Sequence, residues 1–128
     1  MTERDLIERT KQFALRIIKV VGALPRTIEG RAIASQLMRR GTSVAANYRV
    51  ACRARSKPEF ISKLGTVEEE ADESAFWLEL LIDAGLMSES KIRSLLNEAS
   101  EIVAIMASSK KTTRSAWKSQ IANYKSQI

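Results

Sequence analysis

Residues 56–86 read SKPEFISKLGTVEEEADESAFWLELLIDAGL, and this stretch decides the fold. Ser56 is a favourable helix N-cap, and Pro58 suits a first helical turn. Gly85 followed by Leu86 predicts a helix end of the Schellman type, in which the leucine folds back. Between these ends, apolar and small residues recur at intervals of four and three, which is the spacing of one helix face. The positions are Phe60, Leu64, Val67, Ala71, Ser74, Leu78 and Leu81.

Three other stretches show the same periodicity and have boundaries of their own. Thr2 and Asp5 resemble a capping box before the first stretch, and Pro25 ends it. Thr27 is a suitable cap for the second stretch and Ser88 for the last. The expected inward positions are Leu6, Thr10, Phe13, Ile17, Val20 and Leu24; then Ala34, Leu37, Gly41, Val44, Tyr48 and Ala51; then Ile92, Leu95, Ala99, Ile102, Met106 and Ser109.

Four helices with short connections predict an all-α, single-domain, up-down-up-down antiparallel bundle over residues 1–110. Residues 111–128 either extend the last helix or form a mobile basic tail. In the hairpin centred on Ser56, residues whose numbers sum to about 113 should lie at similar heights. Arg40 is then level with Glu73, and the ring of Tyr48 lies over Gly65.

Charge is segregated along the chain of 128 residues, whose net charge is +6. Residues 1–67 carry a net charge of +9, residues 68–109 carry −8, and residues 110–128 carry +5. Such segregation suits an acidic helix beside basic ones, head-to-tail contacts between subunits, or binding of nucleic acid.

Catalytic and cofactor motifs are missing from the sequence. The chain has no histidine, which argues against di-iron and haem sites of helical bundles. Thr42 and Ser43 have no base at a recognisable spacing, and Cys52 reads as a half-buried thiol in a reducing compartment. No signal peptide and no membrane-spanning run is visible. We therefore expect a cytoplasmic protein that is not an enzyme and binds no metal or cofactor.

A basic surface on the second and third helices is the strongest functional signal. The residues expected to contact RNA or DNA are Arg39, Arg40, Arg49, Arg53, Arg55 and Lys63. Lys110, Lys111, Arg114 and Lys118 add charge at the C-terminal end. Phosphate contact needs only positive charge within reach, so binding should depend on salt and have little sequence preference.

Four short motifs carry a family resemblance: GTSVAANYR at residues 41–49, SKPEFISKL at 56–64, EADE at 70–73 and WLELL at 77–81. Over about residues 5–110 the chain resembles the bacterial four-helix-bundle proteins first noted in intervening sequences of 23S rRNA genes. The resemblance implies a ring, typically a homopentamer. The chain is also similar to the accessory protein of diversity-generating retroelements, a pentameric bundle that binds nucleic acid and a reverse transcriptase. Glu69 and Phe76 depart from the family's usual lysine and tyrosine, and the segment after Lys110 has no clear counterpart.

The hypothesis from sequence is a non-catalytic, self-assembling bundle that binds RNA or DNA through the basic surface. The alternative is an adaptor ring that presents Trp77 or Phe76 to a protein partner such as a reverse transcriptase. Buried glutamates at 70 and 73 would need an arginine partner. The residues expected to serve structure or subunit contacts are Gly41, Asn47, Tyr48, Glu70, Glu73 and Trp77.

Overall fold

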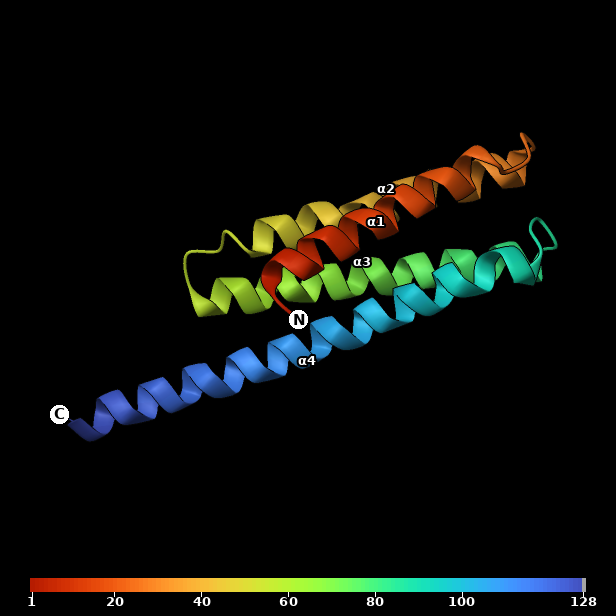
Figure 1. Cartoon of the computed structure of the whole chain (residues 1–128). Helices are drawn as coiled ribbons and strands as arrows, with labels where there is room; N and C mark the ends of the chain where they lie inside the picture. Colours follow the sequence, from red (N-terminus) through yellow and green to blue (C-terminus); the bar gives the residue numbers. More distant parts are fainter. Residues whose placement is uncertain (128) are drawn as a thin grey trace.

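The computed structural model describes residues 1–127 and contains four helices in up-down-up-down order (Figure 1). These are α1 (Glu3–Gly22), α2 (Ile28–Ala51), α3 (Lys57–Asp83) and α4 (Glu89–Gln127). Helices that are neighbours in sequence pack against each other, and α1 also touches α4. The prediction of an all-α four-helix bundle is confirmed.

The starts of α1, α2 and α3 follow the capping residues of the sequence, whereas the Ser88 hydroxyl, expected to cap α4, lies against the Ser90 hydroxyl. Thr2 and Asp5 form a reciprocal capping box, and the Thr27 hydroxyl accepts a hydrogen bond from the Gly30 amide at 3.1 Å. At α3, the Ser56 hydroxyl accepts from the Glu59 amide at 3.2 Å. These bonds satisfy backbone N–H groups that have no partner within the helix, so each start is fixed locally.

The end of α3 is a Schellman motif, as the sequence predicts. Gly85 has a φ of +71°, a left-handed conformation that favours glycine. The Leu86 amide donates to the Leu81 carbonyl at 3.0 Å, and the Gly85 amide donates to Ile82 at 3.0 Å. This turn reverses the chain into α4.

The core is built from the predicted stripes. Phe13, Ile17, Leu37, Leu64 and Leu78 are completely buried. The predicted inward positions that are only half-buried are Val20, Ala34, Phe60 and Ser109. The stripes omitted the buried apolar residues Ala14, Ile33, Ala75 and Leu96.

Gly41 of α2 lies directly against Ile17 of α1. A Cβ atom at this position would lie 2.6 and 2.7 Å from the two γ-carbons of Ile17. Gly41 was expected to face inward and to serve structure or subunit contacts, and this close packing gives it a structural role. The predicted contact of Tyr48 with Gly65 is wrong, since a Cβ on Gly65 would have only Lys110 Nζ within 4 Å, at 4.0 Å. Tyr48 is buried, at 2% exposure, but does not cover that glycine.

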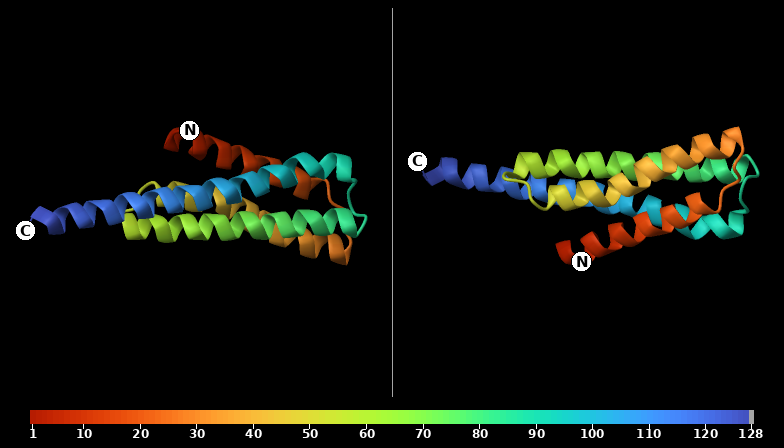
Figure 2. Two further views of the ribbon diagram at one scale, coloured as in Figure 1. Left: turned by 90° about the horizontal axis from the view of Figure 1, so that it is seen from below. Right: turned by 90° about the horizontal axis from the view of Figure 1, so that it is seen from above.

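The N-terminal part of α1 diverges from α4, as both views in Figure 2 show. A polar clasp joins the two helices. Arg9 donates two hydrogen bonds to the Glu98 carboxylate, at 2.7 and 2.8 Å, and one to Glu101 at 2.5 Å. These bonds from Arg9 hold the pKa of the Glu98 carboxyl below its usual value.

Helix α4 is far longer than the rest of the bundle requires. It runs without a break through residues 111–127, so this segment is helical, and Ile128 lies outside the described residues. Among residues 1–127, no helix has both the length and the apolar character needed to cross a bilayer.

We predict that Gly41→Ala destabilises the protein by about 1–2 kcal/mol, because overpacking against Ile17 outweighs the gain in helix propensity. Ile17 is β-branched and completely buried, so it cannot swing aside. The measurement is urea unfolding followed by circular dichroism. Gly22→Ala is the matched control, since a Cβ there has no atom within 4 Å. Equal stability changes for the two variants would contradict the prediction.

We predict that Glu98→Gln lowers stability at pH 7 by about 1 kcal/mol, because it removes a charged acceptor from Arg9. A lowered pKa in the folded state means that this stabilisation is present above the usual carboxyl pKa and is lost as pH falls through the folded value. The difference from wild type should therefore disappear in acid. Unfolding midpoints from pH 7 down to pH 3 measure it, with Glu69→Gln, which removes an exposed carboxylate that forms no ion pair in the described chain, as the control. A pH-independent difference would speak against this role.

Candidate nucleic-acid interface

The six predicted basic residues lie on α2, on the turn that follows it and on α3. Arg39 and Arg49 are exposed on α2, while Arg53 and Arg55 are exposed in the turn between α2 and α3. Lys63 is half-buried in the second turn of α3. Arg40 is half-buried on α2.

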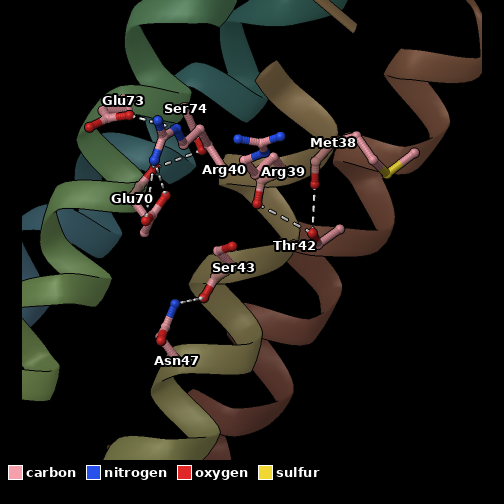
Figure 3. Close-up of polar contacts among 9 residues, drawn as sticks. All are labelled: Met38, Arg39, Arg40, Thr42, Ser43, Asn47, Glu70, Glu73 and Ser74. Carbon is pink, nitrogen blue, oxygen red and sulfur yellow. Dashed lines mark hydrogen bonds and ion pairs between the residues drawn. The ribbon is translucent and has the colours of Figure 1, made fainter. Parts of the chain in front are cut away.

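Arg40 differs from the others because two carboxylates of α3 neutralise it (Figure 3). Its Nε lies 2.7 Å from Glu73 Oε2, and its Nη1 lies 3.4 Å from Glu70 Oε2. The Nε–H does not point at the Glu73 oxygen, so the contact is a charge pair and not a directed hydrogen bond. The prediction that Arg40 and Glu73 lie at the same height on neighbouring helices is confirmed. Arg40 therefore joins α2 to α3 and has little charge left for an outside ligand.

The other five basic residues have no acidic side chain within ion-pair distance in the part of the chain that the structure describes. Four cations of the described chain do form ion pairs with acidic side chains. They are Arg9 with Glu98 and Glu101, Arg40 with Glu70 and Glu73, Arg93 with Glu89, and Lys110 with Glu68. We call these five residues the basic hairpin: Arg39, Arg49, Arg53, Arg55 and Lys63. Its positive field is not cancelled by contacts within the subunit.

The small polar residues between Arg39 and Arg49 bond within their own helix (Figure 3). The Thr42 hydroxyl donates to the Met38 carbonyl at 2.6 Å, and the Asn47 amide donates to the Ser43 carbonyl at 2.9 Å. Asn47 was expected to serve structure or an interface, and its amide here supports α2. Recognition by this surface would then rely on the arginines.

A pocket of about 410 Å³ lies at the turn between α2 and α3. Cys52, Arg55, Lys57, Phe60 and Thr113 are among its lining residues. Burial raises the pKa of the Cys52 thiol and of the neighbouring Tyr48 phenol. Both groups therefore stay protonated at neutral pH, which does not suit a nucleophile.

Phe76 and Trp77 form an edge-to-face pair on α3, with ring centroids 5.1 Å apart. Trp77 packs partly against the core, while Phe76 is 53% exposed. Of the two aromatic residues considered for contact with a protein partner, Phe76 is therefore the one that faces outward.

Carboxylates do not gather into a metal site: within residues 1–127, no group of three or more His, Cys, Asp or Glu side chains is placed to hold a metal ion. Glu70 and Glu73, which were expected to need an arginine partner if buried, face Arg40.

Residues 2–108 match the family model described as 23S rRNA-intervening sequence protein. The chain belongs to this family. Among solved structures, it is similar to a protein of unknown function from the S23 ribosomal protein family of Bacteroides thetaiotaomicron. The two are 32% identical, the match covers 87% of this chain and 99% of the other, and the TM-score is 0.80. No curated protein matches the chain.

This family member also has contacts that sequence reasoning did not find. The Arg9 clasp and the pair between Lys110 Nζ and Glu68 at 2.9 Å each join residues far apart in sequence. Periodicity places each residue on a helix face but does not give the rotation of α1 against α4. The available signal was the excess of glutamate in residues 68–109, which requires cations from the other helices.

We predict that Arg40→Gln destabilises the bundle by about 1–2 kcal/mol, because it leaves Glu70 and Glu73 without their half-buried cation. Arg39→Gln removes the same charge from the adjacent exposed position and should change stability by less than about 0.5 kcal/mol. Thermal and urea unfolding measure both. If both variants match wild type, the pairing of α2 with α3 does not depend on Arg40.

Proposed function

We propose that this protein binds RNA or DNA without catalysis, through the basic hairpin. The observation that carries the proposal is that five cations occur together on α2, on the turn after it and at the start of α3, and that none of them has an acidic partner in the described chain, while Arg40 beside them is paired. Unpaired cations gathered on one surface are what phosphate contact needs. RNA is the first ligand to test, since the family takes its name from intervening sequences of 23S rRNA.

The proposed contact is to the phosphate backbone. Arginine side chains bind phosphate with paired N–H donors, and affinity then comes from the release of counterions. Arg39 and Arg49 are ten residues apart on α2, about 15 Å along the helix, so one strand can contact both.

We also propose that the protein assembles with itself into a ring, of which a homopentamer is the expected form. Leu15 and Ile18, one turn apart on α1, are 49% and 43% exposed, and Met38 on α2 is 37% exposed. Exposed apolar residues of this size favour subunit contacts. The basic hairpin and the acidic residues of α3 have opposite charge, which suits a heterologous interface that closes.

A second candidate function is a protein-binding adaptor. The exposed face of Phe76, backed by Trp77, favours it, because an outward aromatic side chain supported by a second ring is a common anchor of protein interfaces. A partner such as a reverse transcriptase would then dock on α3, away from the basic hairpin.

We predict that the double variant Arg49→Ala/Arg53→Ala binds RNA at least tenfold more weakly near 100 mM salt and shows a salt dependence shallower by about two phosphate contacts. The measurement is fluorescence anisotropy of a labelled RNA, titrated at several salt concentrations. Sedimentation of each variant accompanies it, since a loss of assembly would also weaken binding.

The matched control is Lys91→Ala/Arg93→Ala, which removes the same charge from the start of α4, at the opposite end of the bundle. It should bind like wild type. Equal effects of the two double variants, or binding that ignores salt, would refute the basic hairpin as the site. If the Arg49→Ala/Arg53→Ala variant still binds a protein partner as wild type does, and Phe76→Ala does not bind it, the adaptor function is favoured.

A further inference from the structure

The last part of α4 lies outside the family pattern. The family match ends at residue 108, whereas α4 continues to Gln127. We call residues 110–127 the α4 extension. Figures 1 and 2 show its last turns projecting past the turn between α2 and α3, with no other helix beside them. The core cluster contains no residue of the extension, so packing of the core does not explain it.

Two parallel stripes run along the α4 extension. One is basic and consists of Lys111, Arg114, Lys118 and Lys125, spaced three, four and seven residues apart. The other consists of Thr113, Trp117, Ile121 and Tyr124, spaced four, four and three residues apart. At about 100° per residue, the basic stripe flanks the second stripe on one side. Trp117 is half-buried, and Tyr124 is 67% exposed.

The extension is continuous with the basic hairpin. Lys57 Nζ, at the start of α3, donates to Gln120 Oε1 at 2.6 Å. Arg55 and Thr113 line the same pocket of about 410 Å³. The pair between Lys110 and Glu68 fixes the base of the extension against α3. A strand that leaves the basic hairpin at Arg55 would therefore meet the extension next.

Charge decides what kind of ligand fits these stripes. Residues 110–128 contain five Lys and Arg and no Asp or Glu. Among the described residues, Lys110 is the only one of these cations with an acidic partner. If the extension of a second copy packed on the stripe that contains Trp117 and Tyr124, two basic stripes would come together. Their repulsion opposes that packing. A polyanion that carries flat apolar groups matches both stripes.

We propose that the α4 extension binds single-stranded nucleic acid. Lys111, Arg114, Lys118 and Lys125 contact phosphates, and Trp117 and Tyr124 stack on unpaired bases. This inference rests on the proposed function, since the strand also crosses the basic hairpin. It makes the ligand more specific, because bases of a duplex are already stacked and cannot lie on these rings. Single strands are therefore preferred over duplexes of equal length.

The test uses the full chain with Trp77→Phe, which leaves Trp117 as the only tryptophan of the two in the sequence. Poly(U) is titrated while Trp117 fluorescence is recorded. We expect quenching by poly(U) and little by an RNA duplex of similar length. In the wild-type background, Trp117→Ala should weaken poly(U) binding roughly tenfold, and Tyr124→Ala should weaken it severalfold. Phe76→Ala, which removes an exposed aromatic ring from α3, is the control and should have no effect.

The outcomes separate this inference from the proposed function. If Arg49→Ala/Arg53→Ala weakens binding while Trp117→Ala does not and no quenching occurs, the inference fails and the basic hairpin stands. If Trp117→Ala weakens binding while the arginine variant does not, the extension is the site and the hairpin proposal fails. If the protein binds an RNA duplex and a single strand with equal affinity, the proposed stacking of Trp117 and Tyr124 on unpaired bases is overturned. The fluorescence of Trp117 could instead change when the protein concentration is raised and not when poly(U) is added. A second copy of the chain then covers the apolar stripe, and this too overturns the inference.

Discussion

Ion pairing with the acidic stretch of residues 68–101 organises the surface of this bundle. Every ion pair in the described chain uses a glutamate from that stretch: Glu68, Glu70, Glu73, Glu89, Glu98 and Glu101. The cations that face it, such as Arg9 and Arg40, are neutralised and join helices. Cations near the turn between α2 and α3 form no ion pair with it in the described chain. Their charge remains available because the pairing is local, and ion pairs weaken quickly with distance in water.

The same constraint separates two kinds of arginine that look identical in sequence. Arg39 and Arg40 are neighbours, but successive residues of a helix point about 100° apart. Arg40 therefore turns toward α3 and Arg39 toward solvent. The structural role of one and the proposed binding role of the other follow from this rotation. In the described chain, the only ion pair of the α4 extension is the one between Lys110 and Glu68, so its other cations resemble Arg39.

Most of the fold could be predicted from sequence because its signals are local. Caps at Thr2, Thr27 and Ser56, the glycine turn at Gly85, and the spacing of apolar residues each act within a few positions. The register between α2 and α3 could also be predicted from sequence, because a short turn fixes which residues of the two helices lie at the same height. The Tyr48 contact with Gly65 failed because equal height does not mean that two side chains face each other.

Sequence by itself determined four helices, the starts of α1, α2 and α3, the end of α3, the antiparallel order and the segregation of charge, since helix periodicity and capping depend on neighbouring residues. It left open where α4 ends, because the segment after Lys110 could be helix or tail. Only the tertiary structure decided which cations are neutralised, that Ile17 lies against Gly41, and that the α4 extension stands beside the basic hairpin. Those facts depend on how each helix is rotated about its axis. That rotation is set by the packing of the whole core, in which every helix constrains the others at once.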